Sequence, residues 1–382
     1  MNIASGRPLR IAALEPSGRL YGSEYCLLDI VRGVNSERFN WSVITPAGKG
    51  FAELLQSQNV YCCTALPGDL HHRGRFGRAR AYARLLLAVR KLRPDLLYVN
   101  QAGMLRAGSL ICKVLGIPGV CQVQTLEDAD WISRSNAGHG QMLAYICNSD
   151  FIASRTAVPA DRRCVLYQGI GSSPVYAQMP SENTEPLSLG LIGRISESKG
   201  HYLALEAAAL LRARGMRVRI RVIGDGVTAE DTARFSAAVT SAGLQDTFDF
   251  RGYCRDLRTE FSSIQLLLIP SIAEPLGRVL YDAAHFGVPV IAADSGGLGE
   301  ICRLYGVGES FPAGRADALA AVIQRCAGQL ESVTRAFRSN SAAMVQSLGM
   351  KSYLAVIETI LMQASRGVSC AVRWRGDAVL DR

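Results

Sequence analysis

Short apolar segments alternate with segments of helical periodicity along most of this chain. The run from Arg10 to Leu14 is short and apolar, as in a buried strand, and apolar side chains then recur at helical spacing between residues 26 and 34. Where short connections join strand to helix to strand, the strands run parallel. The alternation therefore predicts an α/β protein built on doubly wound parallel sheets. Further strands of the first half are expected at 41–45, 60–64 and 96–100.

The alternation is interrupted once, near the middle of the chain. Residues 171–186 are rich in Ser and Pro and lack an apolar period, which is typical of a linker. The pattern then restarts with an apolar run from Leu187 to Ile192. We therefore predict a Rossmann-like domain at 1–170, a linker at 171–186, a second domain at 187–350, and a C-terminal helix and tail at 351–382. A chain of 382 residues is long enough for two such domains.

The composition is that of a globular protein, with 48% hydrophobic and 20% charged residues. No apolar stretch is long enough to span a bilayer, and the N-terminal sequence lacks the apolar core of a signal peptide. We therefore expect a cytoplasmic protein. The eleven cysteines are odd in number and never spaced as CxxC, so neither a disulfide framework nor a metal site is expected.

Positive charge is concentrated in the first half of the chain. Residues 1–180 contain 20 Lys and Arg against 12 Asp and Glu, whereas the remainder contains 22 against 21. From His71 to Arg93 there is no acidic residue, and apolar residues separate the basic ones. The segment predicts an amphipathic helix whose basic face either is solvated or meets an anionic membrane surface, which we favour. It contains no nucleic-acid recognition motif. The basic residues are Arg73, Arg75, Arg78, Arg80, Arg84, Arg90, Lys91 and Arg93.

The stretch from Ser271 to Glu300 contains the strongest candidate site. A helix is expected to begin at Pro275, because proline is tolerated at the first helical position. Its unpaired N–H groups, on Leu276, Gly277 and Arg278, would attract anions. Glu274 stands just before this helix, and Asp282 is about 10 Å further along it at 1.5 Å per residue. Two carboxylates at this separation could bind two parts of one polyol.

The same stretch resembles the signature of retaining glycosyltransferases of the family 4 type (glycosyl transferases group 1), which have the GT-B fold of two Rossmann-like domains facing across a cleft. One position departs from the family pattern, which has a second glutamate where this chain has Asp282. The resemblance implies that Glu274 orients the donor sugar and that Asp282 binds the ribose. The matching residues are Glu274, Pro275, Gly277, Gly287, Pro289, Val290, Gly296, Gly297 and Glu300.

Two cations follow the first strand of the second half. Arg194 and Lys199 flank a turn, where they could neutralise a diphosphate. The elements Gly193-Arg194 and Lys199-Gly200 match those that hold the donor diphosphate in the family. The resemblance also implies that backbone atoms near Tyr253 and Cys254 hold the nucleotide base.

In the first half, the resemblance is weaker. Gly22 lies in a strand-to-helix loop that resembles the family's loop beside the donor phosphates, with Tyr21 in place of its first glycine. Glu24 in this loop either stabilises the helix start or contacts the ligand. Gln124 occupies the position of a family histidine near the donor sugar and is a possible sugar contact. His139 is expected at the surface rather than as a substitute for that histidine.

The resemblance implies an acceptor-side domain at 1–170, a nucleotide-sugar-binding domain at 187–350, and a C-terminal helix that crosses back to the first domain. It implies transfer of a sugar from a nucleoside diphosphate sugar to a glycan or lipid-linked acceptor, in cell-surface polysaccharide assembly and without a metal cofactor. Two alternatives are a sugar-nucleotide epimerase and a non-catalytic GT-B partner subunit. A dehydrogenase is disfavoured, because no GxGxxG follows either first strand.

Overall fold

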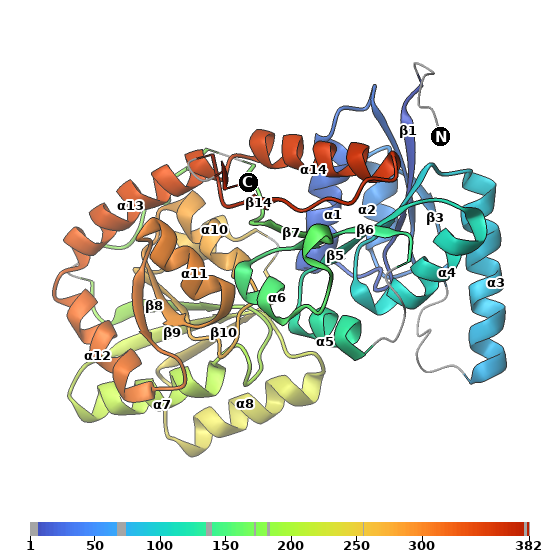
Figure 1. The fold of residues 1–382 in the computed structure, drawn as a ribbon. Helices are drawn as coiled ribbons and strands as arrows, with labels where there is room; N and C mark the ends of the chain where they lie inside the picture. Colours follow the sequence, from blue (N-terminus) through green and yellow to red (C-terminus); the bar gives the residue numbers. More distant parts are fainter. Residues whose placement is uncertain are drawn as a thin grey trace. The chain divides into compact units, whose positions relative to one another are not determined.

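The computed structural model describes residues 7–66, 74–134, 140–171, 173–181, 184–254, 256–377 and 380–381. The chain forms two compact units, which are coloured along the sequence in Figure 1. The first unit contains Met1–Gly169 and Leu348–Arg382, and the second contains Ile170–Ser347. Each unit is built on one sheet.

The sheet of the first unit has the strand order β15-β14-β7-β6-β5-β4-β1-β2-β3. Every pair is parallel except β14 with β15. The reversal of strand order at β1 is that of a doubly wound sheet. The strands are β1 (Leu9–Leu14), β2 (Phe39–Ile44), β3 (Tyr61–Cys63), β4 (Leu96–Val99), β5 (Gly119–Val123), β6 (Met142–Cys147), β7 (Arg163–Leu166), β14 (Arg373–Trp374) and β15 (Leu380–Asp381).

The central strands of this sheet are buried on both faces. All residues of β4, β5 and β6 are buried, and apart from Gln122 these strands are apolar throughout rather than alternating. The helices of this unit are α1 (Gly22–Gly33), α2 (Phe51–Ser57), α3 (Arg75–Leu92), α4 (Leu105–Leu115), α5 (Leu126–Arg134), α6 (Asp150–Arg155) and α14 (Met350–Ser365), with short 3₁₀ turns at Ala102–Met104 and Ala160–Arg162.

Helix α14 returns the chain to the first unit. It packs on α1, where Gly33 leaves room for the side chain of Leu354. Glu358 accepts hydrogen bonds from the Asn35 N–H and from Arg38, at 2.9 and 2.7 Å.

The residues after Arg366, which were predicted to be a tail, pack in part within the first unit. Strand β14 pairs with β7, and Trp374 is 1% exposed. The N–H of Cys370 also donates to the carbonyl of Leu143 at 3.0 Å. The periodicity of this segment is weak because a two-residue strand is too short to display one.

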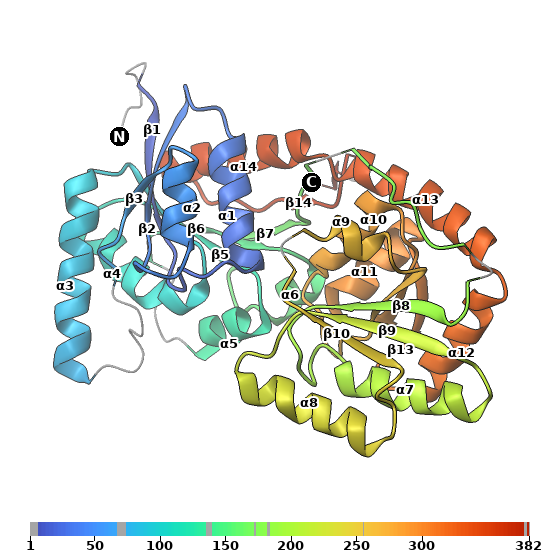
Figure 2. The same ribbon diagram turned by 180° about the vertical axis from the view of Figure 1, so that it is seen from behind.

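The second unit has a six-stranded sheet of order β10-β9-β8-β11-β12-β13, in which all pairs are parallel. Its strands are β8 (Leu187–Ile192), β9 (Val218–Ile223), β10 (Phe248–Gly252), β11 (Leu266–Ile269), β12 (Val290–Asp294) and β13 (Glu309–Pro312). Its helices are α7 (His201–Ala213), α8 (Ala229–Ser241), α9 (Arg258–Phe261), α10 (Arg278–Phe286), α11 (Gly296–Tyr305), α12 (Ala316–Ala327) and α13 (Leu330–Ser347). Figure 2 shows α7, α8 and α12 around this sheet.

The described part of segment 171–186, which was predicted to be a linker, packs in the second unit. The N–H groups of Val175 and Ala177 donate to the carbonyls of His285 and Phe286 at the end of α10, at 2.8 and 2.7 Å. The Tyr176 ring contacts the guanidinium of Arg338 at 4.7 Å. Polar residues in the segment make its sequence resemble a linker, but its backbone is tied to the unit.

No helix among the described residues has both the length and the apolar content to cross a membrane. The eleven cysteines all lie among the described residues, and none of them forms a disulfide.

Candidate functional site

Most of the predicted site residues lie in loops at one edge of the second sheet. In a parallel sheet, the loops after the strands meet at the carboxyl edge, where such folds bind ligands. The loop after β8 contains Arg194 and Lys199, the loop after β10 contains Tyr253 and Cys254, and the loop after β11 contains Glu274. Figure 2 shows β8, β9 and β10 side by side.

Lys199 and Glu274 form an ion pair at this edge. Lys199 Nζ lies 2.6 Å from Glu274 Oε2, and the two side chains are 33% and 11% exposed. Lys199 sits in a tight turn, in which its N–H donates to Ser196 Oγ at 3.3 Å and the Gly200 N–H donates to the Glu197 carbonyl at 2.8 Å. The pair therefore joins two predicted site residues that are 75 positions apart in the chain.

The two loops that hold this pair are also joined through their backbones. The N–H of Ile272 donates to the carbonyl of Ser198 at 3.0 Å. Gly200 has φ +77°, and a Cβ at this position would overlap the carbonyl oxygen of Pro270. A glycine is needed here for both reasons, because the left-handed conformation and the close approach each disfavour a side chain.

The other side of the Glu274 loop is held by the start of α11. The Gly297 N–H donates to the Glu274 carbonyl, and Ser295 Oγ donates to the Ser271 carbonyl, both at 2.8 Å. Gly296, at φ +57°, lies so close to Glu274 O that a Cβ would overlap it. Gly296 of the matched signature therefore makes room for the backbone of the protein itself.

Helix α10 begins later than predicted. It starts at Arg278 rather than Pro275, because Gly277 has φ +87° and cannot continue a helix. Leu276 is buried before the helix, and the Leu280 N–H already bonds to Gly277 O at 2.9 Å. The helix start therefore lies three residues after the predicted one, and Leu276 and Gly277 precede the helix rather than form its first turn.

Asp282 lies one turn inside α10, after Arg278. Burial raises the pKa of this carboxyl, while the nearby charges of Arg278 and His285 lower it. The structure thus places a partly desolvated carboxylate between Arg278 and His285 on the same helix.

The loop after β8 is also joined to the turn after β9. The Gly193 N–H donates to the Ile223 carbonyl, and the Ile195 N–H donates to the Asp225 carbonyl, both at 3.0 Å. Gly193 has φ +143°, and the next residue, Arg194, is exposed. These hydrogen bonds hold the backbone on both sides of Arg194, five residues before Lys199.

Tyr253 and Cys254 follow β10 directly. Tyr253 is 66% exposed, and its N–H donates to Asp225 Oδ2 at 3.1 Å. Cys254 Sγ lies 3.8 Å from Glu260 Oε1, and burial together with this carboxylate raises the pKa of the thiol. The Tyr253 N–H, one of the backbone groups predicted to bind the nucleotide base, is thus hydrogen-bonded to Asp225.

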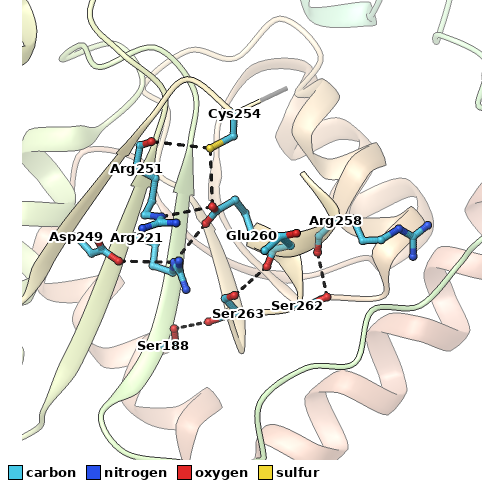
Figure 3. A network of polar contacts seen from close by, with 10 residues as sticks. Ser188, Arg221, Asp249, Arg251, Cys254, Arg258, Glu260, Ser262 and Ser263 are labelled. Atoms are coloured by element: carbon cyan, nitrogen blue, oxygen red, sulfur yellow. Dashed lines mark hydrogen bonds and ion pairs between the residues drawn. The ribbon is translucent and has the colours of Figure 1, made fainter. Parts of the chain in front are cut away.

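A charged network supports this loop from below (Figure 3). Glu260 is 4% exposed and lies between two guanidinium groups, 3.3 Å from Arg221 Nε and 3.4 Å from Arg251 Nε. Arg221 also approaches Asp249 at 3.8 Å, and these two residues are partners in the β9–β10 register. The prediction did not include this network. The sequence feature that could have indicated the network is the alternation of charged and apolar residues in both strands.

His201 is a second contributor that the prediction did not include. The first residue of α7, it is fully buried and packs edge-on against Phe235 at 5.5 Å. Burial lowers the pKa of His201 to about 4, so the ring is neutral, and Nδ1 accepts the Ser196 N–H at 3.5 Å. The ring supports the turn that carries Lys199.

In the first unit, Gly22 and Glu24 lie at the start of α1. Gly22 is exposed, whereas Glu24 is buried and accepts hydrogen bonds from the Tyr21 N–H at 3.2 Å and from Ser23 Oγ at 2.8 Å. Of the two predicted roles of Glu24, this geometry favours stabilisation of the helix start.

Glu24 has a buried carboxyl neighbour, Glu15. Burial and the charge of Glu24 raise the pKa of Glu15 to about 8, although Asn100 donates to it. Gln101 Nε2 donates to Glu15 Oε1 at 3.0 Å and lies 3.3 Å from Glu24 Oε1. The two acids and their amide partners form one buried polar cluster.

Gln124 follows β5 and is 7% exposed. Its N–H donates to Asp128 Oδ2 at 3.0 Å, and its side-chain amide faces Asn100 Oδ1 at 3.4 Å. The predicted sugar contact is thus part of a hydrogen-bonded set within the first unit. His139 and Arg73 lie outside the described residues.

Comparison with known proteins identifies the domain that carries the site. Residues 176–333 match the family model described as Glycosyl transferases group 1. These residues belong to glycosyl transferases group 1. The match contains the Lys199–Glu274 pair, the Asp225 turn and the Glu260 network.

Curated relatives of the group 1 domain are glycosyltransferases. The chain is 37% identical to 2-deoxystreptamine glucosyltransferase of Streptomyces kanamyceticus over 112 residues, which cover 29% of this chain and 28% of that protein. It is 27% identical to 2-deoxystreptamine N-acetyl-D-glucosaminyltransferase of Streptomyces fradiae over 292 residues, 68% of each chain. The matched stretches span 28% to 42% of the length of the first three curated relatives.

The fold also occurs in solved glycosyltransferase structures. HepE of Anabaena, in complex with UDP and glucose, superposes with a TM-score of 0.78 at 22% identity, covering 93% of this chain and 100% of that chain. WaaG, a glycosyltransferase involved in lipopolysaccharide biosynthesis, gives a TM-score of 0.66 at 15% identity and covers 92% of this chain and 99% of that one. The group 1 domain is thus part of a GT-B fold, which confirms the fold prediction.

Proposed function

We propose that this protein is a retaining glycosyltransferase that moves a sugar from a nucleoside diphosphate sugar to a hydroxyl of a glycan or lipid-linked acceptor. The observation that carries the proposal is the Lys199–Glu274 pair, which the loops of a group 1 domain hold at the carboxyl edge of its sheet. The solved structure of HepE with UDP and glucose supports a donor of this class.

In the proposed complex, the donor diphosphate lies against Lys199, Arg194 and the start of α10. Lys199 Nζ donates one hydrogen bond to Glu274 and has two further protons for phosphate oxygens. Glu274 would accept hydrogen bonds from the donor sugar, and Asp282 from the ribose. Backbone groups near Tyr253 and Cys254 would contact the base.

The proposed reaction breaks the bond between the anomeric carbon and the diphosphate oxygen. The acceptor oxygen bonds to that carbon on the same face, and its proton passes to the leaving phosphate, so the configuration is retained. The cations of the second unit stabilise the negative charge that develops on the diphosphate. In this scheme, protein cations take the place of a metal ion.

The first unit is proposed to face the acceptor and an anionic membrane. The part of α3 whose side chains are described has exposed basic residues at Arg78, Arg80, Arg84, Arg90 and Lys91. Each such charge near an anionic surface contributes about 1 kcal/mol. The assignment to polysaccharide assembly is supported by two curated relatives, which are named as an amylovoran biosynthesis glycosyltransferase and a putative colanic acid biosynthesis glycosyltransferase.

Thermal stabilisation by a panel of UDP-, GDP- and ADP-sugars tests donor binding. A ligand at 100 times its Kd adds about 2.7 kcal/mol of stability, which is readily measured. We expect one donor to stabilise the wild type and to stabilise Glu274→Ala much less. Glu197→Ala is the matched control, because Glu197 is an exposed glutamate in the same turn as Lys199. If no donor stabilises the wild type at millimolar concentration, the proposal is wrong.

A further inference from the structure

Helices α3 and α4 lie side by side in the first unit (Figure 1) and leave an apolar groove between them. The groove has a volume of about 340 Å³, at the low end of the roughly 300–1,000 Å³ of small-molecule sites. Each helix contributes four residues at positions i, i+3, i+4 and i+7, which form one face. They are Ala79, Tyr82, Ala83 and Leu86 from α3, and Ala107, Leu110, Ile111 and Val114 from α4.

The face of α3 that lines the groove is not the face that packs in the core of the unit. A different face of α3, formed by Ala81, Leu85 and Val89, is buried. The face that lines the groove has alanines at 79 and 83, and these small side chains leave the space open. Along α3 the lining extends from Ala79 to Leu86, about 10 Å at 1.5 Å per residue. The groove is thus a narrow apolar channel on a helix that is already packed on its other side.

Exposed apolar side chains continue from the groove onto the surface. Leu110 and Val114 line the groove and are 46% and 57% exposed, and Leu87 of α3 is 57% exposed. Exposed apolar groups that gather in this way mark an interaction site.

The surroundings of the groove are strongly cationic. In the sequence, Asp95 is the only acidic residue between Asp69 and Glu127, and its carboxylate forms an ion pair with Arg7 at 2.8 Å. Arg78 lies one helical turn before Tyr82, and Arg90 one turn after Leu86; on α4, Arg106 and Lys113 are exposed beside Leu110. Among the described residues, the side chains of these four cations form no ion pair or hydrogen bond.

We propose that this groove binds one hydrocarbon chain of an anionic lipid, whose head group lies among the cations around it. The apolar lining matches the chain, and the unpaired positive charge matches the head group. A soluble acidic partner would satisfy the charge but not the apolar channel. The inference rests on the membrane part of the proposed function and is independent of the donor site in the second unit.

A photoreactive lipid tests the proposal. Phosphatidylglycerol vesicles that contain a phosphatidylglycerol with a diazirine on its acyl chain are irradiated with the full-length protein, and the labelled peptides are mapped. We expect labelling on the groove faces of α3 and α4. Ala83→Phe fills the groove without changing charge, so it should lower this labelling about tenfold, because the chain loses its apolar contacts. If labelling is absent from these faces, or unchanged in Ala83→Phe, the proposal is overturned.

Three controls make the outcome specific. Ala355→Phe adds a phenylalanine at another exposed helical position, on α14, and should leave the labelling unchanged. Arg78→Gln combined with Arg84→Gln should reduce vesicle sedimentation but keep the groove open. If sedimentation velocity shows a dimer that Ala83→Phe abolishes, a second copy occupies the groove and the lipid proposal is wrong.

If Ala83→Phe does not fold, Ala79→Met serves as the filling variant. Thermal stabilisation of the same variants by the sugar donor is measured in parallel. If the donor still stabilises them, a negative lipid result contradicts only the lipid proposal and not the proposed transferase function.

Discussion

At the scale of single residues, the Lys199–Glu274 pair is the feature on which the account depends. Its side chains are partly exposed, so its contribution to folding is expected to be small, about 0–1 kcal/mol. Its contribution to donor binding should be larger, because a hydrogen bond to a charged group contributes about 1.5–3 kcal/mol.

We therefore predict that Lys199→Ala changes the melting temperature little but weakens donor binding by about tenfold or more. Isothermal titration calorimetry of both single variants and the double variant measures the coupling. The double variant should lose less than the sum of the single losses, since each residue supports the other. Additive losses would show that the two residues act independently.

Glu15 gives a pH prediction for the first unit. Its pKa is raised from 4.5 to about 8, so the folded state retains a proton that the unfolded state releases. Stability should therefore fall as pH rises from about 4.5 to 8, at up to about 1.4 kcal/mol per pH unit for this group, and then level off.

Urea unfolding followed by tryptophan fluorescence measures this dependence selectively, because Trp41, Trp131 and Trp374 all lie in the first unit. Glu15→Gln should flatten the dependence, whereas Glu37→Gln, at an exposed glutamate, should not. A wild-type profile that is flat or rises between pH 5 and 8 would show that Glu15 is ionised in the folded protein.

At the scale of elements, strands were easier to predict than loop contacts. The apolar run from Leu187 to Ile192 became β8 at the same bounds, because buried parallel strands are near-continuous apolar runs. The start of α10 was misplaced because proline at a first helical position is common, whereas the sequence does not show that Gly277 has a left-handed conformation and lies against α11. A Cβ there would lie 2.8 Å from Leu298 of α11.

The Glu260 network shows a second limit of prediction from sequence. Charges in β9 and β10 are visible in the chain, but their pairing depends on the register that opposes Arg221 to Asp249. The Lys199–Glu274 pair is similar: both residues were predicted in the site, whereas their direct contact requires the loop connection from Ile272 to Ser198.

Loop packing leads to a prediction for Gly200. Gly200→Ala should destabilise the second unit by more than the roughly 1–2 kcal/mol of a left-handed alanine, because its Cβ would also overlap Pro270 O. Gly215→Ala is the matched control, since Gly215 has φ +76° in the same unit and no atom within 4 Å of the added Cβ. Calorimetric melting compares the two variants. Equal losses would show that the close approach to Pro270 has no energetic role.

The network in Figure 3 gives another prediction at this scale. Glu260→Gln should destabilise the second unit by about 3 kcal/mol, because it leaves the guanidinium groups of Arg221 and Arg251 without their buried countercharge. It should also weaken donor binding, through the loop at Tyr253. Asp249→Asn, at the more exposed partner, should have a smaller effect on both readouts. If a folded Glu260→Gln protein binds the donor with wild-type affinity, the network does not contribute to donor binding.

At the scale of the whole molecule, the account assigns the donor to the second unit and the acceptor and membrane to the first. Since Arg194 and Lys199 are proposed to neutralise the diphosphate, removal of divalent ions should leave turnover unchanged. Turnover in excess EDTA, compared with turnover in added Mg²⁺ or Mn²⁺, checks this. A loss of activity in EDTA that a divalent ion restores would assign charge neutralisation to a metal.

The central claim is sugar transfer from the group 1 domain to an acceptor. The most direct measurement is incubation of the protein with a radiolabelled form of the stabilising donor and a cell-envelope extract of lipids and glycans. We predict that the label enters the extract, that Glu274→Ala abolishes this, and that Glu197→Ala does not. Label recovered only as an altered nucleotide sugar would indicate an epimerase, and label left wholly in the donor would indicate a non-catalytic protein. Either result would contradict the account.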